Sequence, residues 1–454
     1  MKQLLSSVLV YLLLFDIIIL LTEEVPLLIE IVVLILALTM IFISLIHFRY
    51  MLKIKDIFHP YYIITLIYFL IFIFAPFIWI KSGKTDWYGV PVMDTIVEST
   101  LLFITGYIFF YIGYILFKPI KINTKIVMKN YNTQKALLLS RVLFWGSLFL
   151  VMLYFRSYGK DLLYMLTLGR KGSNSLTMTN NFSSYNFLML FSYSLPSMWL
   201  TMYAFTKKIN VLLIVEFIIT FFILTTIGFR FIIIVFIISL LVFNYTIKQK
   251  RPNLLGIVKL SAIAFFITTI IGYWRKDIRS GDVLEVFTLN DLFYEFMPNI
   301  EVFFPFYNLV KFVPKFFSFQ FGKSFFSFFI QLIPRAIWQE KPAPPVIEIV
   351  KYMYSDFYTS GPAYPNIGEF YLDFGIIGII IGMFVFGVVS KKSYGLIKDT
   401  NNTFNIIIFS LLLPFWLQYI TRGYFNQVLQ GIIFIFAPII IVKRVSFIKQ
   451  NKHE

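Results

Sequence analysis

Residues 211–247 read VLLIVEFIITFFILTTIGFRFIIIVFIISLLVFNYTI and decide the fold class of this chain. Two apolar runs, each close to the roughly 20 residues that a helix needs to cross a bilayer, meet at the tight turn Gly228-Phe229-Arg230. The charged residues of the stretch are Glu216 and Arg230. The pattern predicts two membrane-spanning helices joined by one short turn.

The same apolar character extends over all 454 residues, of which 59% are hydrophobic and 14% charged. A soluble domain carries about 25% charged residues, and the mean hydropathy here is +0.81, so a water-soluble globule is excluded. The first apolar run lacks a small-residue cleavage site, which predicts an uncleaved span rather than a signal peptide. We predict an all-α polytopic membrane protein with about twelve spans, at residues 4–22, 25–46, 61–80, 94–117, 139–157, 184–204, 211–228, 229–246, 256–274, 366–390, 403–421 and 427–442.

The net charge of +17 follows mainly from topology. With both termini placed in the cytoplasm, the loops predicted inside hold 22 Lys and Arg residues against three acidic residues. The outer segments hold 17 against 14. Because the basic loops are short and lie next to the membrane, we expect no nucleic-acid partner.

The predicted spans divide the chain into three parts. Residues 1–274 hold the first nine helices, residues 275–365 form a large extracytoplasmic loop, and residues 366–454 hold the last three helices and a cytoplasmic tail. The loop contains twelve Phe between positions 303 and 329, interrupted by Pro and Lys. We expect amphipathic helices lying in the outer membrane interface, with a re-entrant pair as the alternative.

Arginine is concentrated on the outer side, since seven of the eleven Arg residues fall there. A guanidinium group binds phosphate in a bidentate manner, which lysine cannot do. Arg230, Arg275 and Arg422 are expected at the outer ends of spans, at the depth of a lipid diphosphate. Structural arginines that reach for the interface would lie at the same depth.

Two motifs follow one another after the Phe-rich loop. The first is IPRAIWQEKP at Ile333–Pro342, and the second is IGEFYLDFG at Ile367–Gly375. In this order, they resemble the Wzy-type oligosaccharide repeat-unit polymerases, which make O-antigens and capsular or exopolysaccharides. The Gly-x-Arg at Gly228–Arg230 also fits that family. Some members carry Arg-x10-Gly motifs in two outer loops, and none occurs here, so residue roles built on that motif are not transferred.

The resemblance implies a glycosyltransferase C-like enzyme of the bacterial cytoplasmic membrane, with its active site facing outward. It would transfer a growing glycan from undecaprenyl diphosphate to the terminal sugar of a lipid-linked repeat unit. Expected partners are undecaprenyl-diphosphate-linked oligosaccharide and membrane lipid, with a chain-length regulator and a flippase of the same pathway. No cofactor is implied.

A diphosphate leaving group needs positive charge nearby. The three His residues, His47, His59 and His453, are all predicted cytoplasmic, and the chain has no Cys, so we expect no metal at the outer face. The outer cations remain. The expected diphosphate contacts are Arg230, Arg275, Arg335 and Arg422, with Arg279, Lys276 and Lys341 as weaker candidates.

The acceptor hydroxyl needs a base, which without an outer His is a carboxylate. Glu369 is the first candidate, followed by Asp373 and Asp277. Glu369 and Asp373 are four residues apart and share one helix face. The alternatives are that Glu369 positions an outer arginine, and that both carboxylates stabilise the helix dipole.

Two further features of the outer region each have two interpretations. The aromatic candidates for stacking on sugars, which could equally be interface anchors, are Trp338, Tyr352, Tyr364 and Tyr371. Gly368, Gly375 and Gly382 recur every seven residues, which predicts close approach of another helix.

Three other functions remain open. A ligase that uses the same lipid carrier would share the outer arginines. A transporter or flippase is disfavoured because no internal repeat is visible and because no basic residue is expected to pair with the buried carboxylates Asp16, Glu30, Glu98 and Glu216. A purely structural membrane protein is the last alternative.

Overall fold

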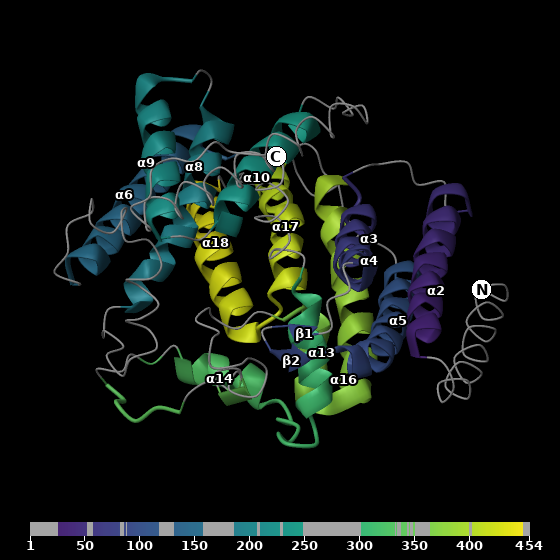
Figure 1. Cartoon of the computed structure of the whole chain (residues 1–454). Coiled ribbons are helices and arrows are strands. Elements are labelled where there is room, and N and C mark those ends of the chain that lie inside the picture. The colour runs from purple at the N-terminus through teal and green to yellow at the C-terminus, as the bar shows by residue number, and fades with distance from the viewer. Residues whose placement is uncertain are drawn as a thin grey trace, which may run out of the picture.

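The computed structural model of the chain describes residues 26–51, 58–81, 86–87, 89–117, 131–157, 186–206, 209–227, 230–247, 301–331, 364–398 and 402–447, with short stretches between 333 and 349. Nearly all of these residues are helical (Figure 1). The long helices are α2 (Pro26–Ile46), α5 (Met93–Leu116), α6 (Thr133–Ser157), α9 (Val211–Ile227), α10 (Arg230–Ile247), α16 (Asn366–Ser393), α17 (Thr403–Thr421) and α18 (Phe425–Ser446).

Shorter elements complete the described part. A composite helix joins α3 (Pro60–Phe69), η2 (Leu70–Phe74) and α4 (Ala75–Lys81), and another joins η3 (Asn186–Tyr193) to α8 (Ser194–Phe205). The remaining elements are η1 (His47–Met51), η4 (Tyr394–Lys398), α13 (Phe303–Phe312), α14 (Lys323–Gln331) and the two-residue strands β1 (Asp86–Trp87) and β2 (Val90–Pro91).

Ten of the twelve predicted spans coincide with these helices, whereas residues 4–22 and 256–274 lie outside the described part. Six helical stretches of the described chain are long and apolar enough to cross a membrane. They are Pro60–Lys81, Met93–Leu116, Thr133–Arg156, Asn366–Leu396, Thr403–Thr421 and Val428–Ser446. The all-α membrane class is therefore confirmed, whereas the number of spans and the sides of the loops stay predictions.

Helices α5 and α16 are packed backbone against backbone. A Cβ atom at Gly113 of α5 would overlap the carbonyl of Phe384, and one at Gly387 of α16 would overlap the carbonyl of Phe110. Glycine permits this approach because it has no side chain. The two helices thus form a closely packed pair on one side of the molecule (Figure 1).

Helix α16 is broken near its start. Phe374 has φ −140° and Gly375 has φ +60°, a left-handed conformation that favours glycine. Residues 366–373 fold back along the rest of the helix, so that Asn366 Nδ2 lies 3.8 Å from Met383 Sδ. A straight helix would separate these 17 positions by about 25 Å.

The fold-back corrects two expectations. Residues 366–390 are not one continuous span, because the chain reverses direction at Gly375. The predicted glycine stripe does not face one separate helix, since a Cβ atom at Gly382, or at the neighbouring Gly378, would overlap Phe370 of the preceding segment, whereas Gly368 faces Leu309 and Phe306 of α13. Non-helical backbone at such depth is tolerated where protein surrounds it.

The two described helices of the Phe-rich loop differ from each other. Helix α14 exposes Phe325, Phe326 and Phe329 and lies across the lower end of α18 (Figure 1), as an interfacial helix would. Helix α13 instead has Phe303 to Val310 buried, with Phe304 packed against Trp79 at 4.2 Å. Helix α13 is therefore enclosed by other parts of the protein, and the expectation that the loop helices lie in the outer interface stays a prediction.

One buried carboxylate has a cationic partner that the sequence argument excluded. Arg141 Nε of α6 lies 3.1 Å from Glu216 Oε1 of α9, and the Glu216 side chain is fully buried. Both residues lie near the helix ends predicted to face the cytoplasm. The pair therefore joins two helices at one edge and does not place charge at the midplane, where a transport site would need it.

Candidate functional site

The fold-back segment places Glu369 against the connection between α17 and α18, residues 422–424. Phe425, the first residue of α18, donates its backbone N–H to Glu369 Oε1 at 3.1 Å, and the Tyr364 hydroxyl donates to Glu369 Oε2. Only 1% of the Glu369 surface is exposed. Tyr424, the residue before α18, makes no side-chain cap. Glu369 therefore caps α18 from another part of the chain.

Tyr364 holds the same connection from a second direction. Its carbonyl accepts a hydrogen bond from Gly423 N at 2.9 Å. Burial, and then the neighbouring Glu369 carboxylate, raise the pKa of the Tyr364 hydroxyl well above its ordinary value. The phenol consequently stays protonated near neutral pH and remains the donor to Glu369.

The connection approaches the fold-back segment as closely as backbone atoms allow. A Cβ atom at Gly423 would overlap the Asn366 backbone and would lie 2.8 Å from its Cβ. Arg422, which directly precedes Gly423, ends α17 with its N–H donated to the Gln418 carbonyl at 2.8 Å. The contacts of Gly423 and Phe425 therefore fix the backbone position of the partly exposed Arg422.

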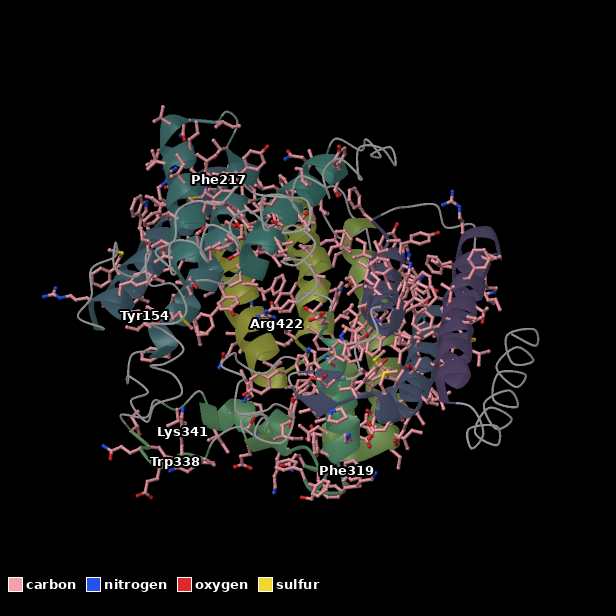
Figure 2. All side chains as sticks on the ribbon, in the orientation of Figure 1. Tyr154, Phe217, Phe319, Trp338, Lys341 and Arg422 are labelled. Atoms are coloured by element: carbon pink, nitrogen blue, oxygen red, sulfur yellow. The ribbon has the colours of Figure 1, made fainter. Side chains whose placement is uncertain are left out.

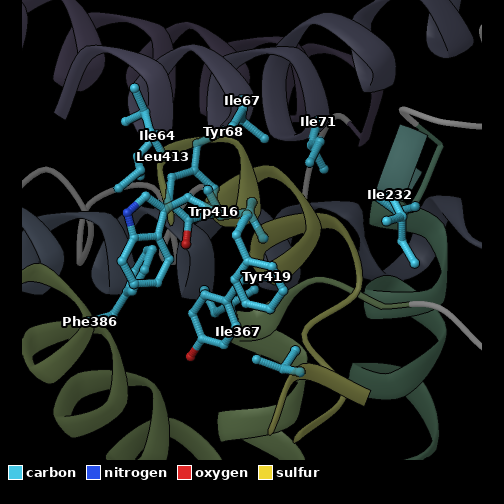
Figure 3. Close-up of a cluster of buried hydrophobic side chains, with 14 of the residues drawn as sticks. Ile64, Ile67, Tyr68, Ile71, Ile232, Ile367, Phe386, Leu413, Trp416 and Tyr419 are labelled. Carbon is cyan, nitrogen blue, oxygen red and sulfur yellow. The ribbon is translucent and has the colours of Figure 1, made fainter. Parts of the chain in front are cut away.

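Asn366 joins the segment to the helices behind it. Its side-chain oxygen accepts a hydrogen bond from the Tyr68 hydroxyl at 2.9 Å. Beside it, Phe386, Trp416 and Tyr419 form an aromatic cluster with ring centroids 4.9–6.1 Å apart (Figure 3). A buried polar side chain in an apolar span costs free energy unless it is hydrogen-bonded. An asparagine at the start of an apolar run is therefore the sequence signal that could have drawn attention to Asn366.

Asp373 performs a similar task at the other end of the segment. Its side chain accepts from Ser324 N at 3.4 Å, at the start of α14. The carbonyls of Leu372 and Asp373 accept from Gln320 N and Phe321 N, both at 2.9 Å. The segment thus binds the starts of two helices, α14 through Asp373 and α18 through Glu369.

Several buried polar atoms around the segment have no hydrogen-bond partner among the residues that the structure describes. Gln418 leaves both amide atoms unpaired although its exposure is 0%, and Asn426 Oδ1 is also unpaired. Asn426 uses its other amide atom, Nδ2, to bond Ser327 Oγ of α14 at 2.9 Å. Sequence reasoning missed these polar residues, whose buried atoms need a hydrogen-bond partner that the described residues do not supply.

Two other predicted site residues, Trp338 and Lys341, lie apart from this group, whereas Arg422 and Tyr371 belong to the connection and to the fold-back segment. Trp338 and Lys341 lie at the lower edge of the molecule and Arg422 near its middle (Figure 2). Lys341 Nζ donates to the Ile333 carbonyl at 2.8 Å. Tyr371 is buried and donates its hydroxyl to the Val313 carbonyl at 3.1 Å, a structural contact.

The remaining candidates are only partly placed. Arg230 begins α10, which packs along α17, but its side chain is not among those described. Asp277, Arg275, Arg279, Arg335, Lys276 and Tyr352 lie outside the described residues. Within the part of the chain that the structure describes, no group of three His, Cys, Asp or Glu residues could hold a metal ion.

Comparison with known proteins gave one family. Neither the curated proteins nor the solved structures contain a match to this sequence. The family described as O-antigen polysaccharide polymerase Wzy matches residues 4–452, nearly the whole chain. With the apolar helices and the two motifs in place, this match shows that the chain belongs to the Wzy family of O-antigen polysaccharide polymerases.

Proposed function

We propose that this polymerase transfers a growing glycan from undecaprenyl diphosphate to the terminal sugar of a lipid-linked repeat unit. The observation that carries the proposal is the family match over residues 4–452, joined to a built site in which buried hydrogen bonds hold Arg422 at a helix end. We place the site on the outer face of the cytoplasmic membrane, with residues 275–365 as the outer loop between nine preceding and three following helices.

The proposed reaction makes one bond and breaks one. The acceptor hydroxyl oxygen bonds to the anomeric carbon, the bond from that carbon to phosphate breaks, and its electron pair leaves with undecaprenyl diphosphate. The hydroxyl proton passes to a base. Arginine forks at the leaving diphosphate stabilise the charge that develops there, and no metal is assigned.

Arg422 leads the proposed diphosphate contacts. Arg230 is proposed as a second contact, because α10 and α17 pack together and each carries an arginine at the end predicted to face outward. Arg275, Arg279 and Arg335 remain proposed contacts from the outer loop, with Lys341 and Lys276 as weaker ones. Asp373 and Asp277 are the candidate bases, and Trp338 and Tyr352 the candidate sugar contacts, whereas Glu369, Tyr364 and Tyr371 are buried and engaged in hydrogen bonds within the protein.

A strain that lacks this chain tests the function. We expect single lipid-linked repeat units to accumulate on the outer leaflet and the wild-type chain to restore polymer. Accumulation on the inner leaflet would instead indicate a flippase. Complete polymer that remains on its lipid carrier would indicate a ligase.

Single Arg→Lys changes test the arginine clamp, by which we mean the proposed arginine contacts with the diphosphate. At Arg230, Arg275, Arg335 and Arg422 we expect lower polymer yield, because lysine keeps the charge but loses the bidentate geometry. Immunoblots of membranes control for protein level. Normal polymer yield and length in all four variants would refute the arginine clamp.

A further inference from the structure

The place of Glu369 in the second motif makes it a candidate base, yet its contacts match a different task. Both of its carboxylate oxygens already accept hydrogen bonds, one from Phe425 N and one from the Tyr364 hydroxyl. A base must come within about 2.6–3.2 Å of the hydroxyl from which it takes the proton. A side chain with 1% of its surface exposed would have to break this arrangement to do so.

Two hydrogen bonds hold the stretch of chain that directly follows Arg422, the residue that the proposed chemistry needs. Tyr364 binds Gly423 through its carbonyl and Glu369 through its hydroxyl, while Glu369 binds Phe425. Positions 423 and 425 are therefore both attached to the fold-back segment. Arg422 extends from this attached backbone and is partly exposed, unlike the carboxylate beneath it.

The fold-back segment, residues 366–373, is itself held by contacts with the helices around it. Asn366 is bonded to Tyr68, and the chain reversal at Gly375 packs residues 366–373 against α16. A carboxylate beside the first N–H of α18 is also stabilised by the partial positive charge at that end of the helix dipole. A mobile connection would have to be ordered each time a diphosphate bound, whereas a fixed connection presents the guanidinium already oriented.

We propose that Glu369 is a positioning residue, which acts with Tyr364 to hold the α17–α18 connection so that Arg422 meets the diphosphate of the lipid-linked substrate. The inference rests on the proposed function and assigns the carboxylate no part in proton transfer.

The experiment compares Glu369→Gln with Glu369→Ala. Glutamine keeps an oxygen that accepts from Phe425 N, and its NH2 can donate to the Tyr364 hydroxyl oxygen, so it preserves the connection but cannot act as a base. Alanine removes both contacts. Purified proteins elongate lipid-linked repeat units extracted from the strain that lacks this chain, and kcat and KM are measured separately.

We expect Glu369→Gln to keep kcat and KM within about threefold of wild type. We expect Glu369→Ala to lower kcat/KM by roughly 100-fold, with a raised KM, because a displacement of about 1 Å at a reacting group can cost that much. Tyr364→Phe, which loses one contact, should fall between them. Glu216→Gln, at the buried carboxylate of α9 that bonds Arg141, serves as the control for the loss of a buried carboxylate and should keep the kcat and KM of the wild type.

A second measurement tests whether Glu369 acts through Arg422. If it does, Glu369→Ala should reduce activity little further in an Arg422→Ala background, because contacting residues of one unit are not additive. Independent, multiplying losses would contradict the proposal.

Two results would overturn the positioning role. One is a Glu369→Gln loss of 100-fold or more in kcat at unchanged KM and membrane level, which is the signature of a base. The other is full activity of Glu369→Ala. If the wild-type protein itself fails to elongate the extracted units, the proposed function is refuted, whatever activity the variants show.

Discussion

The contact of Gly423 with Asn366 yields a test whose magnitude comes from the structure. Ordinary contact begins at 3.4 Å, whereas a Cβ atom at position 423 would lie 2.8 Å from Asn366 Cβ and nearer still to its backbone. The closest approach is 2.0 Å, to Asn366 Cα, so in Gly423→Ala the connection must withdraw by about 1.4 Å, the difference between 3.4 and 2.0 Å. Because both sides are backbone at the closest point, side-chain rotation cannot relieve the overlap.

Two effects should follow from that shift. Overpacking of this kind costs about 1–3 kcal/mol of stability, and displacement of Arg422 by close to 1 Å should reduce kcat/KM by roughly 10- to 100-fold. Gly423 is not among the described residues with positive φ, so alanine tests overlap rather than backbone strain. Elongation of extracted lipid-linked repeat units and thermal unfolding in detergent measure the two effects.

Gly146→Ala is the matched control. Gly146 lies inside α6, and no described atom comes within 4 Å of a Cβ atom built there. Alanine should stabilise that helix by about 1 kcal/mol and leave elongation unchanged. The packing argument is refuted if Gly423→Ala elongates glycan as wild type does and unfolds at the same temperature.

Three further predictions use other parts of the molecule. Gln418→Met removes two unpaired buried atoms, so the melting temperature should stay level or rise while polymer yield falls; a lower melting temperature with normal yield would contradict this. Asp373→Ala should loosen α14, seen as faster proteolysis near residue 323, whereas Asp373→Asn keeps an acceptor for Ser324 N and should resist; equal cleavage of the two variants would exclude the capping role. Arg141→Ala leaves Glu216 buried without its cation and should cost roughly 2–3 kcal/mol in thermal unfolding, with normal polymer from the protein that remains folded; an unchanged melting temperature would show that the pair contributes nothing.

Much of the fold could be predicted from local pattern. Apolar runs such as 211–228 and 403–421 predict helices because a buried backbone in lipid must bond to itself. The same runs do not show which helices pack together, since a helix that is apolar on all sides has the same sequence pattern whether it faces lipid or protein. For that reason the sequence did not reveal that Phe303 and Phe304 of α13 are buried against other helices, or that α5 approaches α16 through Gly113.

The candidate site, like the fold, could be predicted only in part from the sequence. By itself, the sequence determined the helical membrane class and singled out residues 367–375, because charged and glycine residues are conspicuous in an apolar chain. Only the tertiary structure decided that this motif reverses direction at Gly375 and that the main-chain partner of Glu369 is Phe425, 56 residues later. Hydrophobic periodicity reports on neighbours within one helix, whereas these contacts arise where separate helices meet. The tertiary contacts are therefore the reason to assign the carboxylate a positioning role.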